Sequence, residues 1–371
     1  MTVENLQPET VDILRRVFHG QEPTWPAELS VDAFFTEINF QGIAPLLCYF
    51  LAGKGPPALL ARLRESAMQQ AAFELILERD LRALLDAFAE IQVRPLLLKG
   101  TPLSQTLYPE PGLRPRCDTD LLIPESAREE TAALMKKLGY QGLHEATTDH
   151  ISYQMSYSKK TQGFICSYDM HWQISNCHRQ FCRNFSYDKL VEHSAAILAL
   201  GGDARTLCQG DALILACFHR GKHFARHRDR LIWLYDIHLL CQALSEQDAK
   251  IFYAKAKESE IVHLCVEAIL TASSWFKTEL PLAIEVLLQE NVQDEASALL
   301  LEPGRLKGTK NRALLALQES TSWRERFFFL WRNAFPPAEY MAWRYKSKKK
   351  NMLPWLYAKR FVEGIHIFLK K

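Results

Sequence analysis

Two aspartates spaced two residues apart are the part of the sequence best suited to chemistry. Asp118 and Asp120 stand in the segment DTDLLIP, where an apolar run with the length of a buried strand begins. Residues i and i+2 of a strand point to the same side, so both carboxylates are expected to project together. Their charges repel unless a cation lies between them, one is protonated, or both are well solvated. A divalent metal ion is one solution, and a solvated strand end is the other.

A third carboxylate, Asp169, stands in the segment SYDMHW, which is rich in β-forming residues. We expect this segment to be the second strand of a hairpin and to neighbour the first acidic strand in a small antiparallel sheet. Three carboxylates would then converge. Such a trio can hold Mg²⁺ or Mn²⁺ ions, one activating an attacking hydroxyl and another neutralising a triphosphate and its pyrophosphate leaving group. His171 shares the strand face of Asp169 and is expected to contact substrate or to support the acid.

A candidate anion site precedes the acids. Gly100 ends the apolar segment VRPLLLKG, which we expect to be a strand, and Thr101 begins a brief predicted helix, TPLSQTL. A junction of strand and helix offers backbone N–H groups and the positive end of the helix dipole, which favour phosphate. The segment YPEPGLRP then forms a loop, because its prolines and glycine cannot continue a helix. The sequence thus predicts an anion site next to a cation site.

Helical segments surround this centre. Apolar residues recur at spacings of three and four in several segments, which is typical of amphipathic helices. These segments are 10–18, 30–38 with Ser30 as the N-cap, 56–91, 125–140 and 210–244. The hairpin is expected from 150–157 and 164–174, joined by SKKTQG.

The order of these elements predicts an α+β fold, with a small mixed or antiparallel sheet between helical regions. The expected parts are an N-terminal helical region at 1–88, an α/β core at 89–200 and a C-terminal helical domain at 201–371.

The composition is that of an ordinary globular protein. Of 371 residues, 48% are hydrophobic, and 45 basic residues nearly balance 43 acidic ones, which gives no global electrostatic case for nucleic acid. An acid near the N-terminus and the lack of a long apolar run argue against a signal peptide and a membrane span, so we expect a cytoplasmic protein. Nine cysteines are scattered without a Cys-x-x-Cys pair, and we expect them to be reduced.

Several separated blocks, taken in order, resemble a known family. They are KG at Lys99 and Gly100, the stretch LYPEPGLRPRCDTDLLIP, His150 at the start of a strand, DMHW from Asp169, HRGKHFARHRDRLIWLYDIHLL and AFPPAEYMAWRY. This pattern resembles the uncharacterised nucleotidyltransferase family of the DNA polymerase beta superfamily, from about residue 35 onward. The resemblance implies a Mg²⁺-dependent enzyme that moves a nucleoside monophosphate from an NTP to an acceptor and releases pyrophosphate.

The resemblance also implies roles for individual residues. Asp118 and Asp120 would be the metal-binding pair, and Asp169 the third carboxylate that orients or deprotonates the acceptor hydroxyl. Gly100 and Thr101 match the place of the superfamily's Gly-Ser phosphate motif, although this chain has threonine and an inserted YPEPGLRP loop.

Two basic residues belong to the same matching blocks. Lys99 and Arg114 would contact the triphosphate. Their structural alternatives are that Lys99 extends from the end of its strand to solvent and that Arg114 braces the loop by pairing with Asp118 or Asp120.

The helix expected at 210–244 carries a basic stripe. His219, His223 and His227 recur every four residues, with Lys222 beside them, opposite an apolar face. His219 and Lys222 are therefore candidates for a wall against substrate or phosphate; a solvated face and a metal site are the alternatives. In the same stretch, Asp236 is expected to pair with Arg230 or Lys222.

The leading functional hypothesis is nucleotidyl transfer to a hydroxyl or phosphate of a small molecule, peptide or sugar. A metal-dependent glycosyltransferase also uses Asp-x-Asp, but it would carry a larger domain of alternating strands and helices before the acids. A toxin-like nucleotidyltransferase acting on tRNA would use Lys346 and Lys348–Lys350 on phosphates. A non-catalytic nucleotide-binding or RNA-binding adaptor need not keep three acids. The run YKSKKK is otherwise a solvated face or a site for an anionic membrane surface.

Overall fold

The structure is a computed structural model, and it describes most of the chain. The described residues are 3–143, 153–174, 179–201, 203–225, 228–289, 323–336 and 352–369, with isolated positions between 297 and 345. Three features singled out in the sequence lie outside them: His150, His227 and the run of lysines at 346–350.

Four helices precede the sheet. They are α1 (Pro8–Phe18), α2 (Val31–Phe40), α3 (Ala44–Leu51) and α4 (Pro57–Glu90), after a short 3-10 turn, η1 (Val3–Asn5). Ser30 caps α2 as expected, because its hydroxyl accepts a hydrogen bond from the backbone N–H of Ala33. The sequence did not predict α3, since its eight residues, APLLCYFL, are apolar almost throughout and show no helical period.

Seven strands form one mixed sheet in the order β3-β4-β5-β2-β1-β7-β6. The strands are β1 (Leu96–Leu98), β2 (Thr119–Leu122), β3 (Gln141–Leu143), β4 (Gln154–Thr161), β5 (Phe164–His171), β6 (Ala195–Ala196) and β7 (Arg205–Thr206). This confirms the predicted fold class. The expected antiparallel pairing of the two acidic strands is wrong, because β2 and β5 run parallel. After β2 the chain crosses over through α6 (Arg128–Lys137), and the two antiparallel reversals from β3 to β5 leave β5 in the direction of β2.

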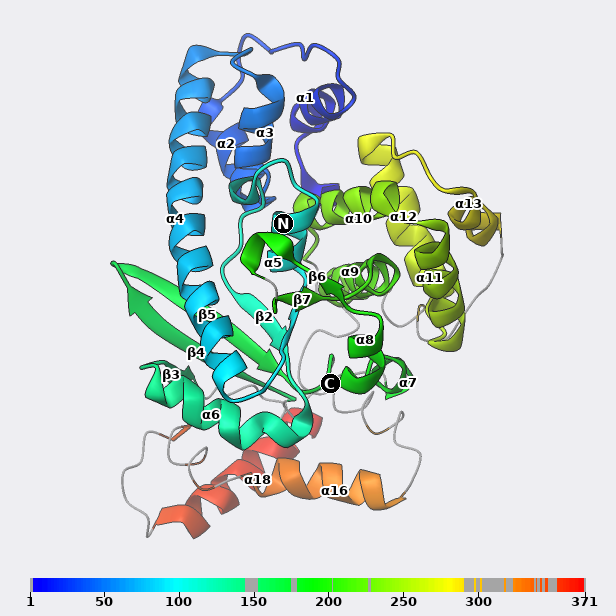
Figure 1. Cartoon of the computed structure of the whole chain (residues 1–371). Helices are drawn as coiled ribbons and strands as arrows, with labels where there is room; N and C mark the ends of the chain where they lie inside the picture. The colour runs from blue at the N-terminus through cyan, green and yellow to red at the C-terminus, as the bar shows by residue number, and fades with distance from the viewer. Residues whose placement is uncertain are drawn as a thin grey trace.

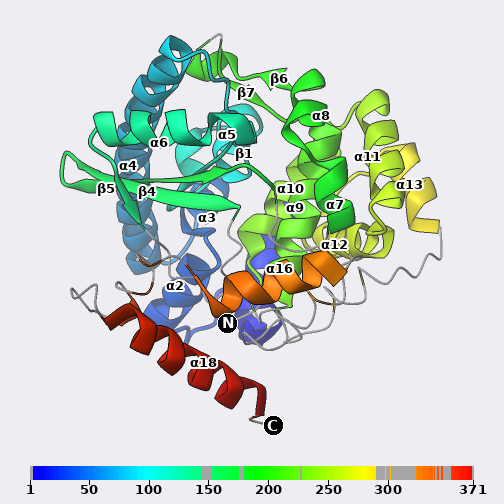
Figure 2. The same ribbon diagram turned by 90° about the horizontal axis from the view of Figure 1, so that it is seen from below.

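The two faces of the sheet border different hydrophobic cores. On one face, Leu97 and Leu121 pack with side chains of α4 and α6. On the other, Leu96, Leu98 and Leu122 join a larger core with the N-terminal and C-terminal helices. Figures 1 and 2 show α4 running from α2 and α3 down to the sheet, so this helix contributes to both cores.

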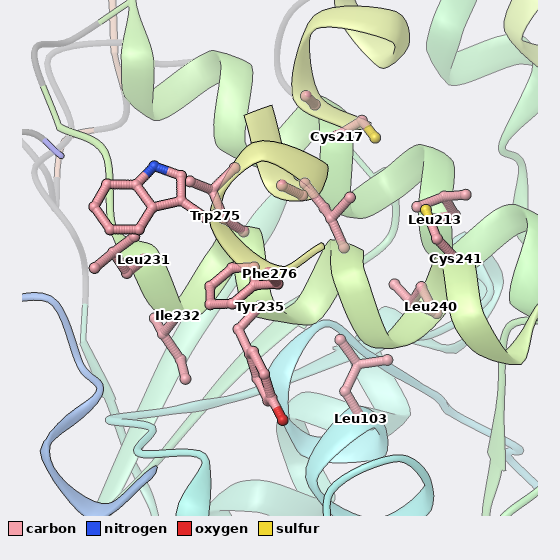
Figure 3. Close-up of a cluster of buried hydrophobic side chains, with 14 of the residues drawn as sticks. Leu103, Leu213, Cys217, Leu231, Ile232, Tyr235, Leu240, Cys241, Trp275 and Phe276 are labelled. Atoms are coloured by element: carbon pink, nitrogen blue, oxygen red, sulfur yellow. The ribbon is translucent and has the colours of Figure 1, made fainter. Parts of the chain in front are cut away.

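The remaining helices follow the sheet or connect its strands. Those among the described residues are α5 (Gly100–Thr106), α7 (Arg179–Asn184), α8 (Tyr187–Glu192), α9 (Gln209–Phe224), α10 (Leu231–Ala243), α11 (Glu246–Glu258), α12 (Val262–Phe276), α13 (Leu282–Gln289), α16 (Trp323–Ala334) and α18 (Leu353–Leu369), with short 3-10 turns η2 (Pro111–Leu113), η3 (Glu125–Ala127) and η4 (Leu198–Leu200). Figure 3 shows Leu103 of α5 near Tyr235 and Leu240 of α10, in the same hydrophobic core as side chains of α9 and α12. This contact anchors the element after β1 to the C-terminal helices.

The prediction of one long helix at 210–244 is wrong, because the chain forms two helices there, α9 and α10. A buried ion pair explains the break. Arg220 donates to the carboxylate of Asp229 at 2.9 Å. In one continuous helix, nine residues would separate these two positions by about 13 Å along the axis. The chain therefore has to turn before α10.

Two further findings concern composition. Within the part of the chain that the structure describes, no helix is both long and apolar enough to cross a membrane. Seven cysteines in that part form no disulfide bond: Cys48, Cys117, Cys166, Cys208, Cys217, Cys241 and Cys265.

His238 on α10 gives the fold a predictable pH dependence. Its ring is buried, Nδ1 lies 2.9 Å from Oγ1 of Thr278, and burial lowers the pKa of His238 from 6.5 to about 4. A histidine with a lowered pKa in the folded state stabilises the fold above its unfolded pKa, and this stability is lost as the pH falls. We expect His238 to account for a loss of about 3 kcal/mol between about pH 7 and about pH 4. Chemical denaturation of the wild type and of His238→Asn at both pH values measures this, and equal losses in the two proteins would contradict it.

Candidate metal centre

Strand register brings two of the predicted acids together. Asp120 on β2 lies directly opposite Asp169 on the parallel strand β5. Side chains at paired positions share a face of the sheet, and His171, two residues after Asp169, shares that face as well. It is the face whose apolar residues join the core with α9 and α10. The acids therefore project toward the C-terminal helices.

Three side chains in this register could hold one metal ion. Ligand atoms of Asp120, Asp169 and His171 all lie within 4.8 Å of one another. Asp118 is not in this group: it precedes the first residue of β2, and its side chain is exposed. The structure thus adds an imidazole to the predicted carboxylates and leaves Asp118 at the edge of the group.

Asp120 is the electrostatic centre of the group. Its Oδ1 lies 2.5 Å from Nζ of Lys99 and 2.8 Å from Nε2 of His171. Burial alone would raise the pKa of Asp120, but the Lys99 ammonium and the hydrogen bond to His171 outweigh burial and hold that pKa well below its usual range. Asp120 is therefore ionised at all working pH values.

Lys99 reaches Asp120 from an unusual backbone position. Lys99 lies between β1 and α5 with φ 57°, and residues other than glycine rarely adopt a positive φ. Leu98, the last residue of β1, pairs with Asp120, so the chain has to turn sharply there to bring the next side chain onto the same carboxylate. Strain of this kind is concentrated at functional sites.

Asp118 has a different environment from Asp120. Although its side chain is accessible to solvent, the surrounding protein partly desolvates the carboxylate. This effect, followed by the negative charge of Asp120, raises the pKa of Asp118 to about 6. Asp118 and Asp120 thus differ in their pKa: the pKa of Asp120 is lowered, whereas Asp118 titrates close to neutral pH.

Asp169 is held by neutral hydrogen bonds instead of an ion pair. Its Oδ1 accepts a hydrogen bond from Oγ of Ser156 at 2.5 Å, and its Oδ2 accepts one from Nε2 of Gln154 at 3.4 Å. Both donors are on β4, where Ser156 pairs with Asp169. The carboxylate remains partly exposed. Sequence reasoning missed both donors, although the hairpin register contains them.

Gly100 follows Lys99 and lies under the side chain of Arg114. A Cβ at Gly100 would come within 2.6 Å of Nη1 of Arg114. Arg114 cannot easily move, because its Nε and Nη2 donate to Asp236 of α10 at 3.2 Å and 2.6 Å. Tyr108 donates to the same carboxylate at 2.7 Å. The expectation that Asp236 pairs with Arg230 or Lys222 is wrong, since its described partners are Arg114 and Tyr108.

Thr101 is buried and turned away from the acids. Its hydroxyl lies 3.4 Å from that of Thr119, which alternates with Asp120 along β2 and so faces the other side of the sheet. Thr119 also accepts a hydrogen bond from Arg116, whose guanidinium is paired with Glu74 of α4. The segment around Gly100 is thereby braced by α4 on one side and α10 on the other.

The helix α9 places His219 beside this centre. Burial lowers the pKa of His219 well below its usual value, and the charge of Lys99 lowers it further, while Asp120 acts in the opposite direction. The ring is therefore neutral, and its centroid lies 4.5 Å from that of His223 and 5.2 Å from that of Trp233. Lys222 extends over the ring of Phe218, at 5.9 Å from its centroid. The part of α9 that was predicted to contact substrate or phosphate is therefore lined by aromatic rings, and the ring of His219 carries no charge.

The model of one protein family, described as an uncharacterised nucleotidyltransferase, matches residues 27–277. The chain belongs to this family. The nucleotidyltransferase match begins before α2 and ends just after α12, so it includes β1, β2, β5, α9 and α10, the elements that carry the candidate centre. The helices α16 and α18 lie beyond it. No curated protein matches the chain.

Proposed function

We propose that this nucleotidyltransferase moves a nucleoside monophosphate from an NTP to a hydroxyl or phosphate acceptor and releases pyrophosphate. The observation that supports the proposal is the register of Asp120 and Asp169 on neighbouring parallel strands, which gathers their carboxylates with His171. Lys99 and the aromatic wall of α9 border the same group. The acceptor would be a small molecule, a peptide or a sugar.

The donor set fits a hard divalent cation. Carboxylate oxygens suit Mg²⁺ and Mn²⁺, and the additional imidazole of His171 is compatible with Mn²⁺. We propose Asp120 and Asp169 as the main ligands, with Asp118 at the edge of the group completing the set. When bound, the metal would neutralise the triphosphate and lower the pKa of the attacking hydroxyl.

The protein's own residues would divide the remaining work. The Lys99 ammonium lies 2.5 Å from Asp120 Oδ1, beside the proposed metal ligands, so we propose it as a phosphate contact. Asp169 is partly exposed, and we propose its carboxylate as the base that accepts the proton of the acceptor hydroxyl. Phosphate contacts of Gly100, Thr101, Lys222 and Arg114 stay predictions; Arg114 already pairs with Asp236.

Calorimetric titration of each of the four NTPs, with Mg²⁺ and with Mn²⁺, tests the proposal while pyrophosphate release is followed in parallel. We expect metal-dependent binding of at least one NTP by the wild type. Asp169→Asn should weaken it by about tenfold to a hundredfold. The released product distinguishes the two enzyme classes, because a nucleotidyltransferase releases pyrophosphate and a glycosyltransferase would release a nucleoside diphosphate.

Arg16→Ala is the matched control, because Arg16 lies on α1 in an exposed ion pair with Asp12. It should bind NTP as the wild type does. The proposal would be wrong if the folded wild type bound no NTP with either metal, both in the absence and in the presence of a panel of acceptors.

A further inference from the structure

The helices α16 and α18 expose large apolar side chains. On α16, Trp323, Phe327, Leu330 and Trp331 are each at least half exposed. Their spacing of four, seven and eight residues from Trp323 places them along one face of the helix. Scattered exposed apolar residues are normal in globular proteins, but a contiguous stripe with two tryptophans marks a surface that contacts something else.

The second helix continues this surface. Trp355, Phe361 and Val362 of α18 are also more than half exposed. Figure 1 shows α16 and α18 together at one end of the molecule, and Figure 2, viewed from that end, shows both on the near side. We call the seven exposed side chains of the two helices the terminal apolar surface.

Two hydrogen bonds connect α18 to residues that follow α16. Tyr357 of α18 donates a hydrogen bond to the carbonyl of Pro336 at 2.6 Å, and Tyr345 donates to Glu363 at 2.8 Å. Leu356 is buried. These contacts tie α18 to the chain that follows α16, while the seven side chains of the terminal apolar surface remain about half exposed or more.

The charge of this part of the chain is strongly positive. Residues 323–371 contain 12 Lys and Arg against 3 Asp and Glu, a net charge of +9, whereas the whole chain carries +2. Residues 1–322 therefore carry −7. The basic residues include Arg324 and Arg326 on α16, and Lys359 and Arg360 on α18. Apolar and cationic side chains are thus combined on the same two helices.

We infer that α16 and α18 bind the surface of an anionic membrane. Helices that lie in a bilayer interface combine Trp, Phe and Leu with Lys and Arg. Here Arg324 and Lys359 lie over the rings of the exposed Trp323 and Trp355, where they would meet the headgroups. Lysine and arginine clusters add attraction to anionic headgroups, and tryptophan favours the interfacial region. A nucleic acid would match the charge and can stack bases on the aromatic rings, but it would leave the aliphatic Leu330 and Val362 exposed. The inference does not depend on the proposed activity, because both helices lie outside the family match.

Co-sedimentation of the full chain with phospholipid vesicles tests the inference. We expect binding to vesicles with about 30% phosphatidylglycerol to be at least about tenfold tighter than to phosphatidylcholine vesicles, and to weaken as salt is added. The double variant Trp331→Ala/Trp355→Ala should lose at least about tenfold in affinity for the anionic vesicles. Both tryptophans are exposed, so the fold should be kept.

The control is Met68→Ala/Leu75→Ala, which removes two apolar side chains of α4 that are even more exposed than the two tryptophans. It should bind vesicles like the wild type. Equal losses in both double variants, or no preference for anionic vesicles, would overturn the inference. So would salt-sensitive binding of tRNA without vesicle binding, which assigns the surface to nucleic acid. A dimer seen by light scattering that dissociates in the tryptophan variant, again without vesicle binding, assigns it to a second copy.

Discussion

Asp120→Asn is expected to abolish nucleotidyl transfer and to destabilise the protein at the same time. The substitution removes the carboxylate that Lys99 and His171 both contact. An amide binds a hard divalent cation poorly, so activity should fall by on the order of a thousandfold. It also leaves the Lys99 ammonium without its partner, and breaking a buried ion pair in this way costs about 3 kcal/mol. Pyrophosphate release and chemical denaturation measure the two effects.

Asp169→Asn separates the two effects and serves as the matched control. Asp169 is partly exposed, and its described contacts are hydrogen bonds from Ser156 and Gln154. An asparagine can keep part of these contacts, so the free energy of unfolding should change by no more than about 1 kcal/mol. Activity should still fall strongly. An active Asp120→Asn enzyme, or an Asp120→Asn protein as stable as Asp169→Asn, would contradict this account.

Arg114→Ala is expected to lower the free energy of unfolding by about 4 kcal/mol. The substitution leaves Asp236 charged and buried, with only Tyr108 as a hydrogen-bond donor among its described partners. Asp236→Leu should also destabilise strongly, because it leaves the buried Arg114 guanidinium unpaired. Adding it to Arg114→Ala should recover part of the loss, because no unpaired charge is then left. A double-mutant cycle by urea denaturation yields this coupling.

An exposed ion pair provides the comparison for this cycle. Arg16 and Asp12 lie one turn apart on α1 and are both exposed. The same cycle there should give a coupling of less than about 0.5 kcal/mol. If the coupling of Arg114 and Asp236 were equally small, the pair would not brace the segment around Gly100, and its conformation would have to be held by α4 alone.

Local patterns predicted much of this fold. Ser30 indicated the start of α2, and apolar periodicity indicated α1 and α4, because capping and amphipathicity are encoded within a few residues. The apolar run that begins at Asp118 and Asp120 indicated β2. The carboxylates were found for the same reason, since the spacing of two in a strand is a local property.

The hairpin shows where a small misplacement hid part of the site. The segment SKKTQG was expected to form the whole loop. Instead β4 continues to Thr161, and only Gln162 and Gly163 form the turn. Both have positive φ, as a two-residue hairpin turn requires. With the turn centred there, Ser156 falls opposite Asp169. The correct turn would therefore have identified the donor to that acid.

Other features depend on contacts that no local pattern encodes. Arg114 and Asp236 are 122 residues apart in the sequence, and Arg116 and Glu74 are 42 apart. Which basic residue meets which acid follows from how α4 and α10 pack on the sheet. The break between α9 and α10 has the same origin, because the pair of Arg220 and Asp229 forms only after the chain has turned.

The length of α4 has a consequence for how the protein folds. Its 34 residues extend about 50 Å as one uninterrupted helix. Leu59 and Leu63 near its start belong to the core with the N-terminal helices, whereas Leu81 and Phe88 near its end belong to the core beneath the sheet. Unfolding α4 at one end would also remove helix side chains from the core at the other end. The two cores are therefore joined into a single cooperative unit, in which the early helices act as a scaffold for the sheet.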